Sequence, residues 1–265
     1  MRSLAMPWGR SAVAGLTLAS GALACEVETA EHDVSVVCRG GDVQTAAELA
    51  QYESCLRITG DLQIFTGPDL SVVELPNLIV LDGTLMIYSS GSVEAVEFPR
   101  LQTAGAIDLS LAQPEQLRLP ALEHVRGMLD LNRSRFAMLD LPKLRHAGSF
   151  QLSGPVTELH APVLETVGEW EYERHAFSIE ETRLTVLELP ALRRLDASLT
   201  VSQNVELEIL DMPRLGYAWE PVELDRNTRL PTCMAERLAA QLARGGYDGP
   251  VLIASNDDDA PCPLP

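Results

Sequence analysis

The chain has 265 residues, a formal net charge of −18 and a hydrophobic content of 46%. That length allows one or two ordinary domains, and the apolar fraction is normal for a folded protein, so the acidity does not indicate disorder. Nucleic acids and anionic membrane surfaces attract positively charged proteins, so the charge argues against both as partners. It leaves two interpretations open, a cationic partner or a solvated acidic surface.

Residues 1–24 have the parts of an export signal. Arg2 and Arg10 supply the basic region, a stretch of small and apolar residues follows, and residues 22–24 form a small-x-small cleavage site. The apolar stretch is shorter than the roughly 20 residues that span a bilayer. We therefore expect an exported protein whose signal is removed, followed by a short linker over residues 25–33.

Cys25 directly follows the cleavage site. This arrangement resembles bacterial lipoproteins, in which the cysteine at that position carries the lipid, although Ala22 stands where those proteins usually have Leu. An even set of cysteines would pair in an exported chain, and Cys25 is the odd one of five. We expect Cys25 to be lipidated, with ordinary cleavage and an incidental cysteine as the alternative.

The residues before the repeats predict a cap. Val34 to Cys38 alternates and predicts a short strand, and the glycines at positions 40 and 41 predict a turn. Thr45 and Glu48 form a capping box, in which each side chain bonds the other residue's backbone N–H, and it opens a short helix. A disulfide between Cys38 and Cys55 would hold this helix over the open end of the repeats.

Seven copies of one motif, an apolar residue followed by Pro, any residue and Leu, run through the chain. Their prolines are Pro76, Pro99, Pro120, Pro142, Pro162, Pro190 and Pro213. The prolines recur with a nearly regular spacing, and a period in this range is typical of a solenoid, in which each coil packs only on its neighbours.

Each motif is followed, in most coils, by a Gly and then by two apolar residues two positions apart, such as Leu85 and Ile87. This alternation predicts strands with apolar side chains inward and polar ones outward. Pro has no N–H to donate and belongs at a corner between strands, and Gly predicts a tight bend at the opposite corner. We therefore expect an all-β solenoid, a right-handed β-helix of about eight coils with parallel sheets along its faces.

The interval between Pro162 and Pro190 is longer than the others. We expect Trp170 and Tyr172 to be the inward pair of that coil. The extra residues, near Arg174 to Thr182, should then form a surface loop, which solenoids tolerate.

The residues after the repeats predict a second cap. A helix begins at Cys233 with apolar residues at i, i+4 and i+8, and the glycines at 245 and 246 end it. Residues 251–253 predict a last strand, and Cys262 is the natural disulfide partner of Cys233. A zinc site is the competing interpretation of the four cysteines, but closely spaced Cys-x-x-Cys pairs are absent from the sequence.

The arrangement from residue 34 to residue 262 resembles the receptor L-domain family, the leucine-rich-repeat-like β-helical modules of insulin- and EGF-receptor ectodomains, with relatives in fungal cell-wall and bacterial exported proteins. Three features carry the resemblance: a Cys, a short helix and a second Cys before Leu-Arg-Ile-Thr-Gly-Asp-Leu-Gln-Ile (residues 56–64), the repeated Leu-Pro-x-Leu, and the closing Cys, helix and Cys. The chain has one such module, without a cysteine-rich module or kinase, so the growth-factor role does not carry over. The resemblance implies an extracellular recognition module with disulfide caps, followed by a tail over 263–265.

The middle residue between the two inward residues of each coil points outward. These residues form a column of Gln63, Met86, Asp108, Asp130, Gln151, Glu171, Thr200 and Glu223. We interpret the column from Met86 to Glu223 as a candidate binding face, because solenoids use such faces for recognition. A solvated face is one alternative. A carbohydrate-active enzyme is another, since neighbouring Asp108 and Asp130 are at a separation that glycosidase carboxylates use.

Two further groups are weaker candidates. Phe177, on the expected loop, and Trp219 predict an exposed aromatic patch for a partner. His124 and His146 occupy the same position in neighbouring coils, where exposed corner residues are more common than metal ligands.

The sequence thus predicts a non-catalytic recognition or adhesion module at the cell surface, as an outer-membrane lipoprotein or else periplasmic or secreted. We expect a protein or glycan partner, which the charge suggests is cationic, and membrane contact only through a lipid at Cys25. We expect a monomer, no cofactor, no metal and no nucleic acid. A structural envelope protein without a specific ligand is the first alternative, and a β-helix carbohydrate-active enzyme is the second.

Overall fold

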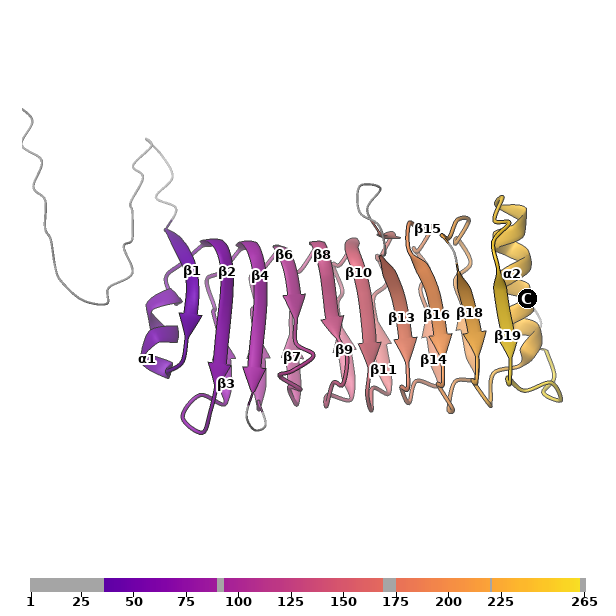
Figure 1. Ribbon diagram of the computed structural model, residues 1–265, viewed down its shortest axis with the longest axis horizontal. Coiled ribbons are helices and arrows are strands. Elements are labelled where there is room, and N and C mark those ends of the chain that lie inside the picture. The colour runs from indigo at the N-terminus through magenta and orange to yellow at the C-terminus, as the bar shows by residue number, and fades with distance from the viewer. Residues whose placement is uncertain (1–35, 90–92, 169–174, 220, 263–265) are drawn as a thin grey trace, which may run out of the picture.

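The structure, a computed structural model, describes residues 36–89, 93–168, 175–219 and 221–262. It is an elongated β-solenoid of about eight turns, whose parallel strands lie side by side along the long axis (Figure 1). The predicted all-β solenoid is confirmed. The predicted export signal, the linker and Cys25 lie outside the described residues.

One sheet of 12 strands forms the main face of the solenoid. Its long strands, in spatial order, are β1 (Val37–Val43), β2 (Arg57–Thr66), β4 (Val80–Ser89), β6 (Thr103–Asp108), β8 (His124–Leu131), β10 (His146–Ser153), β13 (Ala176–Glu180), β16 (Ser198–Ser202), β18 (Val222–Asp225) and β19 (Val251–Ala254). Two short strands, β12 (Thr166–Val167) and β15 (Arg194–Leu195), extend it beside β10. All its pairs are parallel, and equivalent residues of successive coils align apart from local register shifts between β1 and β2, β4 and β6, β6 and β8, and β8 and β10.

Three smaller parallel sheets form the opposite side of the coils. They consist of β3 (Val72–Glu74), β5 (Ala95–Glu97) and β7 (Gln116–Arg118); β9 (Met138–Asp140) and β11 (Glu158–His160); and β14 (Val186–Glu188) and β17 (Ile209–Asp211). The proline motif follows each of these strands.

The proline motif is a β-turn in every coil. In the coil of Pro120, the N–H of Leu122 donates to the carbonyl of Leu119 at 3.2 Å, which places Pro at the second turn position. Pro is favoured there because its fixed φ suits the turn and it has no N–H to satisfy. The two flanking leucines are buried, at 1% and 0% exposure. The motif therefore turns the chain and supplies two core side chains at once, which confirms the predicted corner.

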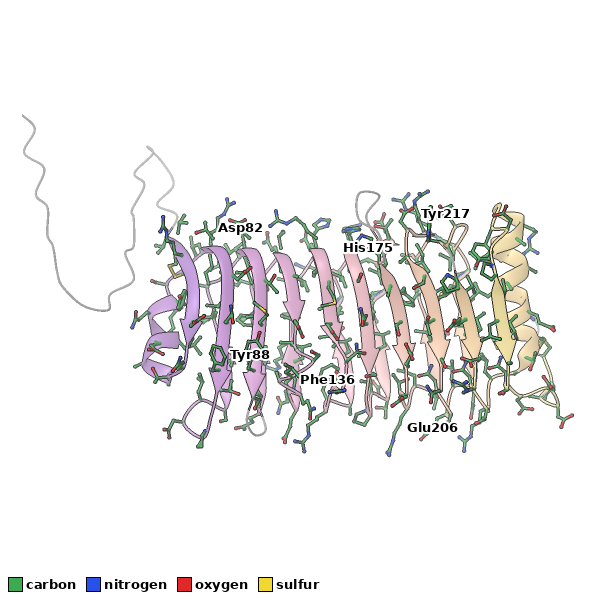
Figure 2. All side chains as sticks on the ribbon, in the orientation of Figure 1. Asp82, Tyr88, Phe136, His175, Glu206 and Tyr217 are labelled. Carbon is green, nitrogen blue, oxygen red and sulfur yellow. A yellow bond between two sulfur atoms is a disulfide. The ribbon has the colours of Figure 1, made fainter. Side chains whose placement is uncertain are left out.

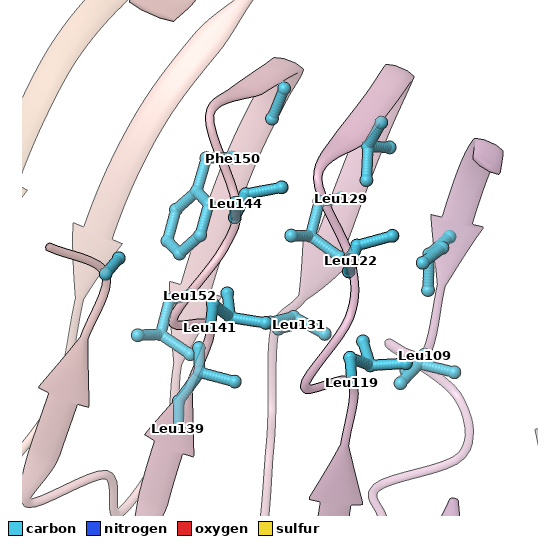
Figure 3. Packing of buried hydrophobic residues seen from close by; sticks show 14 of the residues in the cluster. Leu109, Leu119, Leu122, Leu129, Leu131, Leu139, Leu141, Leu144, Phe150 and Leu152 are labelled. Carbon is cyan, nitrogen blue, oxygen red and sulfur yellow. The ribbon is translucent and has the colours of Figure 1, made fainter. Parts of the chain in front are cut away.

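The core consists of stacked side chains from equivalent positions. Figure 3 shows Leu119 beside Leu141 and Leu122 beside Leu144, with Leu129 and Phe150 facing them from the main sheet. All of these are at most 1% exposed. Burying a side chain of this size contributes about 1.5–3 kcal/mol, so the ladders are the main source of stability.

Four of the five glycines that follow the motif, Gly83, Gly105, Gly127 and Gly148, lie inside strands and do not form the predicted corner. Gly168 directly follows β12 and has a φ of 102°. Gly83 lies inside β4, at a place where the register between β4 and β6 shifts. A Cβ on Gly105, at the same position of the next coil, would collide with the carbonyl oxygens of Asp82 and Gly83. Gly is required here because neighbouring backbones approach closely at a bulge, not because the chain turns. The glycines at 40 and 41 also lie within a strand, β1, at a register shift, so the predicted turn there is wrong.

Both ends of the solenoid are capped as expected. The capping box of Thr45 and Glu48 opens α1 (Ala46–Leu49), which continues as the 3-10 helix η1 (Ala50–Tyr52). At the other end α2 (Thr232–Arg244) buries Met234, Ala235, Leu238 and Leu242. The disulfides Cys38–Cys55 and Cys233–Cys262 are present, with Cα–Cα distances of 5.9 and 6.0 Å.

The long coil differs from the prediction. Its strand in the main sheet is β13, in which Phe177 and Ile179 are both 0% exposed. The extra residues therefore lie between Val167 and Ala176, before the strand rather than within Arg174 to Thr182. Trp170 and Tyr172, the predicted inward pair, lie outside the described residues.

A row of buried polar side chains supports the last coils and was not predicted. Asn204 donates from Nδ2 to the Ile179 carbonyl at 2.9 Å, and its own N–H donates to Asn227 Oδ1 at 3.0 Å. Asn227 repeats both bonds one coil further, to the Val201 carbonyl and to Asn256 Oδ1. Each amide thus satisfies backbone groups where a strand of the main sheet ends, which a buried apolar side chain would leave unpaired.

We expect Asn204→Ala to lower the free energy of unfolding by about 2–3 kcal/mol, because it leaves buried backbone groups without partners. Urea unfolding followed by circular dichroism measures the loss. Asn77→Ala is the control, since its side chain near the surface donates to the Glu53 carbonyl at 2.8 Å and accepts a long bond from Arg100 at 3.4 Å, both in reach of solvent, and its loss should cost less than about 1 kcal/mol. Equal losses in the two variants would contradict a structural role for the buried row.

Candidate binding face

The outer surface of the main sheet contains the candidate column found in the sequence. The strand register aligns Gln63, Met86, Asp108, Asp130, Gln151, Ser178, Thr200 and Glu223, which we call the central column. Ser178 stands where Glu171 was predicted, because β13 rather than the segment before it joins the sheet. Glu171 itself lies outside the described residues.

The spacing along the chain could have revealed this error. In other coils the second inward residue lies at a nearly constant distance before the next proline, as Leu131 does before Pro142. Ile179 keeps this distance from Pro190, whereas Tyr172 is several positions farther away. The proline interval therefore favoured the later segment as the strand.

Asp108 and Asp130 are paired on β6 and β8. Asp108 Oδ1 accepts bonds from the Ser110 N–H at 3.0 Å and the Ser110 hydroxyl at 2.7 Å. Asp130 Oδ1 accepts a bond from the Asn132 N–H at 2.9 Å. Each carboxylate is therefore held by the turn residue two positions further along its own coil, and among the described residues neither forms an ion pair.

The environment of Asp130 disfavours its charge. Partial burial raises the pKa of the Asp130 carboxyl above its ordinary value, and the negative charge of Asp108 raises it further. The Asn132 N–H and the charge of Arg133 act in the opposite direction without cancelling the rise. The pair is thus under electrostatic repulsion that a bound cation would relieve.

A stacked pair of aromatic rings lies beside the carboxylates and was missed in the sequence. Phe65 and Tyr88 are paired on β2 and β4, with ring centroids 5.0 Å apart and ring planes 14° apart. Figure 2 shows Tyr88 on the main sheet, and its hydroxyl donates to Met86 Sδ at 3.5 Å. The two rings are as far apart in the sequence as Pro76 and Pro99 are, so the repeat could have revealed the pair.

The predicted aromatic patch of Phe177 and Trp219 does not form. Trp219 is exposed, at 56%, but Phe177 is fully buried and stacks on Phe150, with ring centroids 5.7 Å apart. A Phe in a strand that continues the sheet takes an inward position, because burying its ring is worth more than exposing it.

The two candidate histidines do lie in neighbouring coils. His124 and His146 are paired on β8 and β10, and His146 Nδ1 lies 2.8 Å from Thr166 Oγ1. Within the described ranges, no group of three or more His, Cys, Asp or Glu side chains could hold a metal ion. None of the helices described there is long and apolar enough to cross a membrane.

The repulsion can be tested by removing one carboxylate. We expect Asp108→Asn to lower the pKa of Asp130, as read from carboxyl carbon chemical shifts in an NMR titration. The raised pKa keeps the native state protonated to higher pH than the unfolded chain, so Asp130 lowers the free energy of unfolding as the pH rises above the ordinary carboxyl range. Asp108→Asn should weaken that decline.

Asp140→Asn, on the opposite side in β9, is the matched control and should leave the titration of Asp130 unchanged. An Asp130 pKa that is insensitive to Asp108→Asn would show that the two side chains do not interact.

Comparison with known proteins assigns neither a family nor a function to the chain. No protein-family model matches the chain, and neither a curated protein nor a solved structure matches it. The similarity to receptor L domains therefore depends on the sequence motifs alone, and the function has to be argued from the face described above.

Proposed function

We propose that the protein is an exported recognition module of the receptor L-domain type, which binds a partner on the outer face of its main sheet and is not an enzyme. The observation that carries the proposal is the stacked pair Phe65 and Tyr88 beside Asp108 and Asp130. Phe65 is 38% exposed, so this ring stack is an outer feature rather than part of the core.

The disulfides support export, because such bonds form and persist in oxidising compartments. Cys38–Cys55 and Cys233–Cys262 each join a terminal helical segment to the rest of the chain. Both bonds are expected to persist only where the surroundings are not reducing. We extend the proposal to a surface location with a lipid anchor at Cys25, with a periplasmic or secreted form as the alternative.

A structural envelope protein is the competing function. It explains the caps and the regular core equally well, since both serve stability. It does not explain a partly exposed ring stack next to two neighbouring carboxylates that form no ion pair among the described residues, because this arrangement lowers solubility and stability without a ligand. This difference favours recognition.

A lipid anchor at Cys25 would add the mass of the lipid to the mature protein. We expect a lipid-modified Cys25 at the N-terminus of protein recovered from the membrane fraction of a bacterial host, as measured by intact mass spectrometry. Cys25→Ser should abolish the modification and release the protein from that fraction. An unmodified Cys25, or an N-terminus elsewhere, would remove the anchor from the proposal.

Recognition itself predicts reproducible binding. We expect a screen of immobilised envelope proteins, extracellular proteins and glycans to give at least one partner with submicromolar affinity. The binding should weaken in Tyr88→Leu and persist in Met138→Ala, which changes an exposed apolar residue on the opposite side. A screen without any partner would favour the structural alternative, and turnover of a glycan that is lost in Asp108→Asn and Asp130→Asn would favour an enzyme.

A further inference from the structure

The last strand of the main sheet, β19, has one edge without a neighbouring strand. It ends the sheet and pairs with β18 alone, in register over its four residues (Figure 1). The carbonyls at positions 250 and 254 accept bonds from the Val222 and Arg226 N–H groups, at 3.2 and 2.8 Å. Because alternate residues of a parallel strand bond on opposite edges, the N–H and C=O groups of Val251 and Ile253 point away from β18. In the part of the chain that the structure describes, no strand bonds these outward groups.

The core is also incompletely covered at this edge. Leu199, Val222 and Val251 are aligned on successive strands, and the first two are fully buried. Although α2 packs its apolar face on the core, Val251 remains 41% exposed. Leu252, which is aligned with the central column through Glu223, is 46% exposed. One more strand beside β19 would therefore bond the free backbone groups and bury apolar surface at the same time.

The opposite edge of the main sheet, on β1, is protected against such pairing. Its register with β2 shifts between Arg39 and Gly41, and the exposed residues of the strand are Arg39 and Asp42. Bulges and charged side chains are the features by which natural sheets prevent edge pairing. The sequence of β19, Val-Leu-Ile-Ala, is uncharged and its pairing has no shift. Of the two ends of the main sheet, only the β19 edge is thus suited to a further strand.

The charges around β19 select the kind of strand that can be added. Asp248 precedes β19, and Asp257, Asp258 and Asp259 follow it. None of these carboxylates forms an ion pair with another described residue. A segment with basic residues at both ends would place cations beside them. A second copy of this chain, paired through its own β19, would instead bring the same negative charges to both ends, and its β1 edge is bulged and charged.

We propose that β19 binds an extended segment of a polypeptide partner as an added strand of the main sheet. The segment bonds the outward backbone groups of Val251 and Ile253, its apolar side chains cover Val251 and Leu252, and basic residues at both its ends meet the carboxylates. In strand addition of this kind, main-chain bonds supply affinity and alternate side chains supply specificity. The edge lies several coils away from Asp108 and Asp130, so this is a second binding surface beyond the proposed function.

Labelled peptides test the proposal with the full mature chain. The probe has valine and threonine alternating over five positions, with two lysines on each side, and fluorescence anisotropy should show saturable binding. Replacing the lysines by glutamates should weaken binding at least tenfold. Two further probes carry N-methyl groups on the valine amides only or on the threonine amides only. One of them should lose at least tenfold in affinity and the other less than threefold, because only alternate amides of an added strand face β19.

Two results with the peptides would overturn the proposal. The first is a probe that shows no saturable binding. The second is an equal loss of affinity in the two methylated probes, since a peptide held by its side chains or its charge alone would not distinguish the two sets of amides.

Variants of the chain locate the binding edge. Val251→Pro removes an outward N–H and places a ring on the free edge without removing a bond to β18, so it should weaken probe binding at least tenfold. Its melting temperature checks that it is folded. Leu252→Thr should weaken binding at least threefold. Leu111→Thr is the matched control, since Leu111 is exposed outside β19, and it should alter binding less than twofold. Equal losses in the two threonine variants would overturn the proposal.

Amide hydrogen exchange tests the same contact without any substitution. In the free chain the Leu252 N–H should exchange slowly, because it faces β18, and the Val251 and Ile253 N–H groups should exchange fast. The probe should slow exchange at Val251 and Ile253 at least tenfold. Binding without this protection would place the peptide elsewhere and overturn the proposal.

The remaining experiments separate this edge from other binding modes. The double variant Asp108→Asn with Asp130→Asn should leave probe affinity within twofold, and a larger loss would place the peptide on the main face and overturn the proposal. Sedimentation velocity should show a monomer in the absence of the probe. A dimer that is lost in Val251→Pro would assign the edge to a second copy of the chain and would overturn the proposal as well.

Discussion

The in-register stacking of the coils is the constraint on which the rest of the structure depends. Parallel strands place equivalent residues of successive coils about 4.8 Å apart, so each side chain meets its own counterpart rather than a complementary partner. Inside the solenoid this favours leucine, since identical apolar side chains pack well against each other. Leu119 beside Leu141 and Leu122 beside Leu144 show the result (Figure 3).

Stacking has opposite consequences for different polar groups. Asn204 and Asn227 each carry a donor and an acceptor, so an asparagine row satisfies its own members and the backbone beside it. Carboxylates carry acceptors only, so Asp108 beside Asp130 produces repulsion. The same geometry that stabilises the buried amides therefore leaves the outer carboxylates in need of a cation.

The corner of the main sheet shows how the protein supplies such cations elsewhere. Asp82 lies between Arg57 and Arg126, with N–O distances of 2.8 and 3.8 Å. Glu165 lies between Arg145 and Arg193, at 2.7 and 3.3 Å. These exposed pairs contribute little stability individually, but they give both carboxylates a cation on each side. The contrast with the central column is what makes that column the candidate for binding.

The sequence by itself determined the local parts of the fold. The hydrogen bonds of the proline turn and of the Thr45 capping box join residues three positions apart in the chain, so both features could be inferred from short stretches. The repeat interval also implied the register, and with it the position of Asp108 beside Asp130. The stacked rings of Phe65 and Tyr88 were implied by the same interval but were overlooked.

The tertiary structure decided which segment of the long coil enters the sheet, a choice that the interval to Pro190 favours but local periodicity does not make. Residues 170–172 and 177–179 have the same alternating apolar pattern, and local periodicity cannot rank them. Packing on the preceding coil does, because Phe177 stacks on Phe150 while β13 keeps its register with β10. The role of the glycines was decided in the same way, since a bulge forms only when the neighbouring backbone is already in place. Contacts between coils, which join residues a full repeat apart, carry information that no single stretch of the chain contains.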